Sequence, residues 1–497
     1  MKHEKLSDAL QQVSDRHIAE AASHKRRFPW VAAVAAVAAL AILLSTMLPP
    51  RAPDNISLQG TTAPLPTTPS VSAPPPMQVE LLSNRYALAT PEYPVLCSYP
   101  TEETLDQNAY SNWWNDQRVL HDQPEGYADS LQSCWEQLLP QLLSSTPGKN
   151  TAYSPVNLYM ALAMLAECTG GQSRQQLLEL MNADSIEALR TQANRVWRAH
   201  YNDDGLTKSI LGSSLWLEKD YGFDPETVDL LAKSYYASVF QGDLGSAEIN
   251  KALQSWLNEQ TEGLLSEQVQ DVKLDTNTVL ALASTANYQV QWIDEFSAKD
   301  NEQRTFHGAS GDVSATFMRQ EQTNGRYYWS DSFGAVGLGL EDGSTMWLFL
   351  PDKGITPESV AAEALSFLQQ RTEDYSNAKT IRINLSVPKF DVAADSELSD
   401  TLKALGVTDV FTPGTADFSA ILPEDDGGYI DQVKHAARVL IDEKGVTAAA
   451  FTAIFRCGST MPPENEMDFT LDRPFLFIVE SRDDLPLFAG IINTIGE

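Results

Sequence analysis

The chain has 497 residues, of which 43% are hydrophobic, so it can bury a large core and has the length of two or three domains. Its 67 Asp and Glu residues outnumber 35 Lys and Arg residues, which gives a formal net charge of −32. This charge excludes a role in binding nucleic acid, because phosphates require a basic face. It predicts a soluble surface and favours basic protein partners.

A stretch of 21 residues without a charged side chain, residues 28–48, is the first feature along the chain. Its length matches the ~20 residues that a helix needs to cross a bilayer core. The basic residues 25–27 directly precede it, so the positive-inside rule places residues 1–27 in the cytoplasm. A cleaved signal peptide is the alternative, although both segments are long for one. We expect a single-pass protein of the cell membrane whose remaining residues lie outside the cell.

Residues 49–76 hold nine of the 27 prolines, mixed with Thr, Ser and Ala. A segment of this composition stays extended and cannot bury a core, so we interpret it as a tether. Residues 77–125 form a pre-domain segment of unclear structure, in which Trp113, Trp114 and Cys97 suggest partial packing onto the following domain. Residues 126–497 form that domain.

The domain begins with helical periodicity. An amphipathic stripe predicts a first helix, which Pro140 should bend; the stripe consists of Leu131, Trp135, Leu138, Leu139 and Leu142. A second helix is predicted to begin at Ser154-Pro155 and to end at Gly170-Gly171. It is apolar on nearly every face, so we expect it to be fully buried.

Strand patterns dominate the later part of the domain. Apolar alternation or short apolar runs predict strands at residues 336–340, 346–350, 381–387, 475–480 and 487–492. Helices come mainly first and strands mainly later, which indicates an α+β fold and not a βαβ repeat. No internal repeat is present.

Motifs of enzymes and metal sites are missing from the sequence. It has no HExxH, no P-loop and no GxSxG elbow. The four cysteines include no CxxC pair and are expected to be mostly buried thiols, and no histidines have metal-site spacing. For a lone histidine such as His435, a hydrogen-bonded structural role is the default. The sequence therefore predicts a protein that is not an enzyme and needs no metal or cofactor.

Short motifs follow one another in a characteristic order from about Tyr127 to Glu497. They are Ser154-Pro155, Trp256-Leu257-Asn258, Thr261-Glu262-Gly263, Thr305-Phe306, Leu350-Pro351, Val387-Pro388-Lys389-Phe390, Ala416-Asp417-Phe418-Ser419, Arg473-Pro474-Phe475-Leu476-Phe477 and Leu487-Phe488-Ala489-Gly490. In these motifs and their order the chain resembles the serpins, a family of serine protease inhibitors. The resemblance implies a serpin fold of three β-sheets and eight or nine helices, with an exposed reactive loop. Together with the expected membrane segment, it suggests a membrane-anchored, bacterial-type member.

The resemblance also implies a mechanism. A target serine protease cuts the reactive loop and forms an acyl-enzyme, and the cut loop then inserts as a new strand of the main sheet and distorts the protease. The family's hinge, where the loop enters the sheet, matches Glu443, Gly445 and the segment Val446, Thr447, Ala448, Ala449 and Ala450. Glycine there allows the chain to turn into the sheet.

The composition of this segment suits insertion. No charged residue lies between Lys444 and Arg456, and a strand that enters the middle of a sheet cannot bury charge. Alternate residues form two uncharged faces, Val446, Ala448, Ala450, Thr452 and Ile454 on one, and Thr447, Ala449, Phe451, Ala453 and Phe455 on the other. Val446 and Phe451 are bulkier than the residues usual there, which should slow insertion.

The position of the cut follows from the family's spacing. Counted from Glu443, the cleaved bond falls between Ser459 and Thr460, and a small residue before the cut suits an elastase-like protease. Arg456 offers a rival, trypsin-like reading, which would shorten the inserting segment by three residues. The alternative function is that of a non-inhibitory serpin, a binding or structural protein at the cell surface.

Positions that control sheet opening in the family also have matches. Asn287 and His435 correspond to a polar pair beneath the central strands, and Trp292 corresponds to a tryptophan near the insertion point. Asn157 stands where the family usually has serine.

Overall fold

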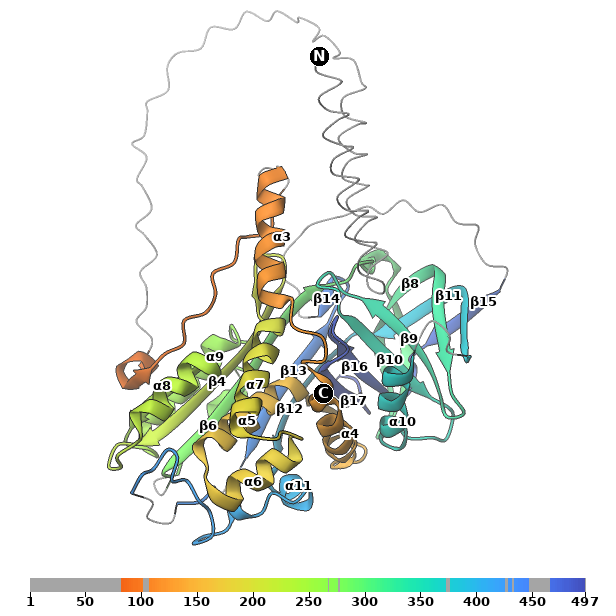
Figure 1. Ribbon diagram of the computed structural model, residues 1–497. Coiled ribbons are helices and arrows are strands. Elements are labelled where there is room, and N and C mark those ends of the chain that lie inside the picture. The colour runs from red at the N-terminus through yellow and green to blue at the C-terminus, as the bar shows by residue number, and fades with distance from the viewer. Residues whose placement is uncertain are drawn as a thin grey trace, which may run out of the picture. The chain divides into compact units, whose positions relative to one another are not determined.

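The computed structural model describes residues 82–101, 107–266, 268–275, 278–371, 376–424, 428–430, 433–446 and 465–496 (Figure 1). The chain separates into two compact units, Met1–Met77 and Gln78–Glu497, and all described residues belong to the second. None of the helices in these ranges is long and apolar enough to cross a membrane. The predicted cytoplasmic segment, membrane span and tether, residues 1–76, lie outside these ranges.

Nine α-helices occur in the described ranges: α3 (Gln107–His121), α4 (Asp129–Ser144), α5 (Pro155–Cys168), α6 (Gly171–Leu180), α7 (Ile186–His200), α8 (Pro225–Ser234), α9 (Ala247–Gln260), α10 (Pro357–Gln370) and α11 (Ser399–Ala404). The short 3-10 helices are η1 (Leu82–Tyr86), η2 (Gln268–Asp271), η3 (Ala298–Asp300) and η4 (Asp409–Phe411).

The two helices expected from the sequence are present as α4 and α5. α4 continues through Pro140 to its end at Ser144. α5 begins with Pro155 in its first turn and is buried along its length, as predicted. The Ser154 hydroxyl donates to the carbonyl of Leu487, 2.9 Å away, instead of capping the helix. The start of α5 is thereby joined to a strand near the end of the chain.

An eight-stranded sheet carries the predicted insertion site. Its order is β1 (Ala87–Ala89), β5 (Ala237–Gly242), β4 (Lys208–Glu218), β6 (Leu280–Gln291), β14 (Gly445–Val446), β13 (Lys434–Ile441) and β12 (Phe390–Glu397), with β3 (Asn202–Asp203) paired to β4. In the described part of the chain, β6 and β13 are joined through the two-residue β14 and not by a ladder of their own. Among the described residues, the hydrogen-bonded connection between β6 and β13 is therefore limited to β14.

The remaining strands form a nine-stranded sheet. Its order is β15 (Glu466–Thr470), β11 (Ala378–Pro388), β8 (Gly311–Trp329), β9 (Phe333–Gly339), β10 (Thr345–Pro351), β16 (Phe475–Glu480), β17 (Pro486–Ile492) and β2 (Thr151–Tyr153), with β7 (Glu302–Gly308) paired to β8. All five predicted strands lie in it. The resemblance implied three sheets, and the described strands form two, because the 19-residue β8 pairs with β7 through residues 311–317, with β11 through residues 317–328 and with β9 through residues 327–329.

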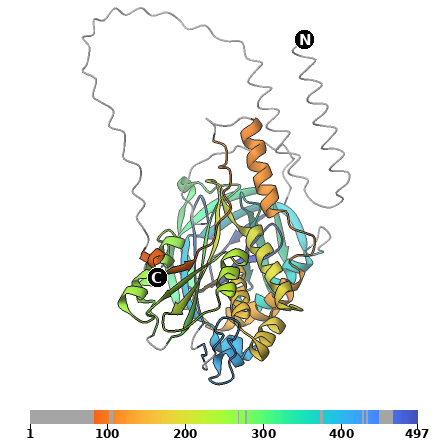
Figure 2. The same cartoon turned by 60° about the vertical axis from the view of Figure 1, so that its left-hand side comes forward.

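The two faces of the eight-stranded sheet are covered by different helices. α9 packs on one face through a small core that includes Trp216, Phe240 and Trp256. α5 and α7 lie against the opposite face, and both belong to the main core that also contains the nine-stranded sheet (Figures 1 and 2). A strand added beside β6 would thus be covered by α5 on one face, while α9 covers part of β6 on the other.

The described residues before the predicted domain, 82–101 and 107–121, pack onto that domain. β1 pairs with β5 at the edge of the eight-stranded sheet, and α3 contacts α7. The Trp113 indole N–H donates to Asp204 Oδ2 at 2.8 Å, while Trp114 is 41% exposed. The expected partial packing of this segment is therefore correct. Of the cysteines, Cys134 and Cys168 are buried and Cys97 is exposed, and Cys457 lies outside the described residues.

A buried histidine fastens the end of α3 to the body. His121 Nε2 lies 2.6 Å from the carbonyl oxygen of Tyr201, so it donates to that oxygen. Burial, assisted by Arg482, lowers the pKa of His121 from 6.5 to about 4. Burial likewise lowers the pKa of the neighbouring His200. Since both histidines are held neutral in the folded state, protonation favours release of this region.

We therefore expect the free energy of unfolding to fall as the pH drops from about 6.5 to about 4 and to be unaffected by these groups above 6.5. A pKa unit corresponds to about 1.4 kcal/mol, so the loss from His121 should be on the order of 3 kcal/mol. Denaturant unfolding at several pH values measures it. His121→Gln retains a donor for Tyr201 and should flatten the profile. An unchanged slope in His121→Gln would contradict this account.

Candidate functional site

The predicted hinge lies at the end of β13, where the chain turns back into the sheet as β14. Asp442 fixes this turn, because its Oδ1 accepts hydrogen bonds from the backbone N–H groups of Lys444 at 2.8 Å and Gly445 at 3.3 Å. The Asp442 N–H in turn donates to the carbonyl of Gly445 at 3.1 Å. The sequence Asp-Glu-Lys-Gly therefore supplies both the acceptor and the glycine that the turn requires.

Gly445 occupies the narrowest point of the site. A β-carbon at this position would lie 2.1 Å from the carbonyl oxygen of Val290 and 2.8 Å from the Cα of Gln291. Both obstacles are backbone atoms of β6, which cannot rotate away as a side chain can. Only glycine allows the chain to enter between β6 and β13 here.

Val446 shows which face of the entering strand is buried. It pairs with Val290 of β6 and with Ile441 of β13, and its side chain is 2% exposed within the main core. This face of the sheet is the one that α5 covers. The alternate-residue face that begins at Val446 is thus directed into the apolar interior.

Glu443 anchors the outer side of the turn. Its Oε1 lies 2.6 Å from Lys389 Nζ and accepts a hydrogen bond from Asn301 Nδ2 at 2.5 Å. Its carbonyl accepts from the N–H of Phe296 at 2.9 Å. Burial opposes ionisation, but the hydrogen bonds from Lys389 and Asn301 hold the pKa of the Glu443 carboxyl below its usual value. The carboxylate is therefore charged, and it ties the hinge to β12 and to the segment before β7.

Trp292 holds the inner side of the same turn. Its indole N–H donates to the carbonyl of Asp442 at 2.9 Å, and its backbone N–H donates to the carbonyl of Lys444 at 2.8 Å. The ring is 2% exposed and packs edge-on against Phe296. The structure thus brings Trp292 to the hinge, where the resemblance implied it.

His435 and Asn287 lie on opposite faces of the sheet. His435 Nε2 accepts from the backbone N–H of Ser154 at 3.0 Å, the ring stacks on Tyr153, and burial lowers its pKa to about 4. It therefore faces the main core. Asn287 Oδ1 accepts from Gln289 Nε2 at 3.1 Å, on the face that α9 covers. In the described conformation they are not partners of each other.

Sequence reasoning missed Lys389, Asn301 and Asp442. The sequence offered a signal for two of them: Lys389 belongs to the motif Val387-Pro388-Lys389-Phe390, and Asp442 begins an Asp-x-x-Gly turn. Asn301 had none, because it reaches Glu443 across 142 residues. The predicted hinge residues 447–450 and the predicted bond Ser459–Thr460 lie outside the described residues.

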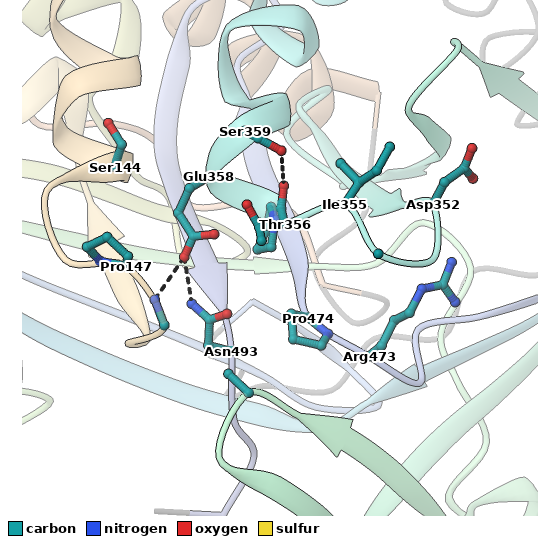
Figure 3. A pocket seen from close by; sticks show the side chains of 14 residues that line it. Ser144, Pro147, Asp352, Ile355, Thr356, Glu358, Ser359, Arg473, Pro474 and Asn493 are labelled. Carbon is teal, nitrogen blue, oxygen red and sulfur yellow. Dashed lines mark hydrogen bonds between the residues drawn. The ribbon is translucent and has the colours of Figure 1, made fainter.

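A pocket of about 620 Å³ lies elsewhere, between the end of α4 and the start of α10 (Figure 3). Some of its polar groups have hydrogen-bond partners: Glu358 Oε1 accepts from Gly148 N–H and Asn493 Nδ2, and Arg473 donates to the carbonyl of Pro351. No cluster of metal ligands occurs within the described ranges.

Comparisons with known proteins agree with this geometry. The model of the family described as serpin (serine protease inhibitor) matches residues 134–495. The chain belongs to the serpin family. Serpins are in general protease inhibitors and not enzymes, so this chain is a non-enzymatic member of an inhibitor family.

Individual serpins match along most of the domain. Putative serpin-Z6C of Oryza sativa subsp. japonica is 27% identical over 383 residues, covering 69% of this chain and 89% of the relative. The thermophilic serpin tengpin in its native state has a TM-score of 0.65 at 21% identity, covering 80% of this chain and 98% of tengpin. Arabidopsis AtSerpin1 in its native stressed conformation has a TM-score of 0.64 at 23% identity, covering 75% and 100%. That this chain is a bacterial-type serpin stays a prediction.

Replacement of Gly445 tests the tightness of the entry point. In Gly445→Ala the new methyl group would collide with the Val290 carbonyl, so β14 should leave the sheet. We expect at least tenfold faster hydrogen exchange of the Val446 amide and of the amides near Val290. Gly222→Ala is the matched control, because nothing lies within 4 Å of a β-carbon there. Unchanged exchange in Gly445→Ala would show that the entry point yields more easily than its geometry indicates.

Proposed function

We propose that this serpin inhibits an elastase-like serine protease, by inserting its cut reactive loop between β6 and β13. The observation that carries the proposal is β14, the start of the loop: Gly445 and Val446 pair with β6, and Val446 also pairs with Ile441 of β13. In the proposed reaction the protease serine attacks the loop, the peptide bond breaks, and the insertion of the freed strand outpaces hydrolysis of the acyl-enzyme.

The register of β14 predicts the surroundings of each inserted residue. Continued along β6 and β13, it places Ala448 beside Tyr288 and Val439, which are 5% and 1% exposed. Ala450 would lie beside Ala286 and Ala437. These neighbours leave room for small apolar side chains and offer no counter-charge. The three alanines therefore match the space that the sheet offers.

The other face of the inserted strand would have polar and charged neighbours. Thr447 would lie beside Gln289, which donates to Glu262, and Glu262 forms an ion pair with Lys208. This corner of the sheet is polar and partly open to water. The two faces therefore differ in how they tolerate charge.

A non-inhibitory binding role is the alternative. A solved thyroxine-binding globulin with thyroxine is among the structures that share the fold, with a TM-score of 0.63 at 21% identity. In this chain Glu358 of the pocket in Figure 3 already accepts hydrogen bonds from Gly148 and Asn493, which makes this carboxylate less available to a ligand. The uncharged loop also favours inhibition over binding.

Reaction with elastase tests the inhibitory function. We expect a covalent complex that survives SDS, and a released C-terminal fragment that begins at Thr460. N-terminal sequencing of that fragment identifies the cut, and a fragment that begins at Cys457 would favour the trypsin-like reading at Arg456. A loop that is cut without any stable complex would support the non-inhibitory alternative.

A charge on the buried face should convert the inhibitor into a substrate. In Ala448→Glu a carboxylate would enter beside Tyr288 and Val439, and burying it unpaired costs several kcal/mol. Insertion then slows while cutting continues, so the stable complex should disappear from the gel. Thr447→Glu, one residue away on the polar face, should retain more inhibition. Equal inhibition by Ala448→Glu and the parent would exclude insertion in this register.

We also propose that residues 28–48 anchor the chain in the cell membrane with the inhibitory domain outside. The support is the charge-free stretch and the basic residues before it. Protease added to intact cells should release the domain and leave residues 1–27 protected, as detected by antibodies to each part. Protection of the domain with loss of the N-terminus would reverse the orientation.

A further inference from the structure

Exposed apolar side chains are concentrated in the segment before the matched domain. Six of the nine large exposed hydrophobic residues in the described ranges fall between residues 82 and 119: Leu82, Leu88, Val95, Tyr110, Trp114 and Val119. Tyr110 and Trp114 are four residues apart on α3, so they share one helical face. We call this pair the α3 aromatic face.

The α3 aromatic face is held in place by neighbouring residues of the same helix surface, which are anchored to the domain. Trp113 and Gln117 donate to Asp204, which is 1% exposed. The Trp113 ring contacts Tyr110 and Trp114, with ring centroids 5.5 and 6.2 Å away. The exposed rings are therefore pre-positioned, so a partner would bind them with little loss of side-chain freedom.

α3 lies at the end of the eight-stranded sheet where the reactive loop begins (Figure 1). Asp203, next to Asp204, pairs with Lys208 of β4, and Lys208 pairs with Gln289 of β6. Two residues further along, Gln291 pairs with Gly445 of the hinge. Three strand spacings of about 4.8 Å separate Asp203 from the hinge strand, so the base of α3 is roughly 15 Å from it.

We propose that the α3 aromatic face is a docking surface for the target protease, in addition to the reactive loop. The inference rests on the proposed function, and continuity with the loop singles out the protease as the occupant. A protease of about 220 residues has a radius of gyration of roughly 17 Å, so one held at the loop is wide enough to reach α3. Tyr and Trp are the residues that most often dominate protein interfaces. The charge of −32 favours a basic protease.

The test compares Tyr110→Ala/Trp114→Ala with Tyr429→Ala, a tyrosine outside the segment that is 49% exposed. Alanine favours helix, so α3 should persist, which circular dichroism checks. The measurement is kcat/KM for elastase cutting the loop in the full chain. We expect about a tenfold loss or more in the double variant and none in Tyr429→Ala. A synthetic peptide of residues 452–464 should be cut no faster than the double variant.

The readout separates this inference from the proposed function. kcat/KM for cutting reports docking even if no stable complex forms, so loss of trapping and loss of docking are distinguishable. Equal kcat/KM in the parent and the double variant would overturn the docking surface. An equal loss in Tyr429→Ala would overturn it as well. Loss of dimers in sedimentation, or of binding to phosphatidylcholine vesicles, with unchanged kcat/KM would assign the face to a second copy or to lipid instead.

Discussion

The close approach of the Gly445 backbone to the carbonyl of Val290 determines how the rest of the site is built. A side chain cannot fit at that point, so the strand that enters there must begin with glycine and be narrow. The same approach allows Val446 to pair with strands on both sides. Under the proposed insertion, the residues after Val446 would continue this pairing with the backbone groups of β6 and β13.

The turn before Gly445 is fixed by several contacts. Asp442 closes the turn, Trp292 binds its inner side, and Glu443 is tied to Lys389 on its outer side. These contacts come from three different regions of the sequence and converge on three residues. A hinge needs such a fixed base, because a strand can enter in a single register only if its first residue is held in place. The register then determines which side chains face the main core and which face α9.

Much of the fold follows from local patterns, but the relation between strands does not. The periodicity of α4 and α5 and the alternation in β9, β10 and β11 were visible because each pattern is contained in one element. Sequence reasoning paired Asn287 with His435, but the two residues lie on opposite faces of the sheet. A period of two shows which residues of one strand share a face, but it does not show which faces of two different strands correspond. The packing of α3 was equally hard to predict. Its anchor, Asp204, is 91 residues from Trp113, and a helix with many Asn and Gln residues has no apolar stripe that reveals its buried side.

The pairing of β14 with both β6 and β13 has a consequence for how many protease molecules one inhibitor can trap. If the pairing extends along the loop as proposed, each added residue contributes backbone hydrogen bonds to two neighbours, worth about 1 kcal/mol each net. Over some ten residues the gain reaches on the order of 10 kcal/mol, a factor of roughly 10⁷ in the equilibrium between the inserted and the free loop. One inhibitor molecule would then inhibit one protease molecule and could not inhibit a second. The amount of protease that the cell could inhibit would depend on the number of inhibitor molecules and on how fast they are replaced, and not on binding affinity.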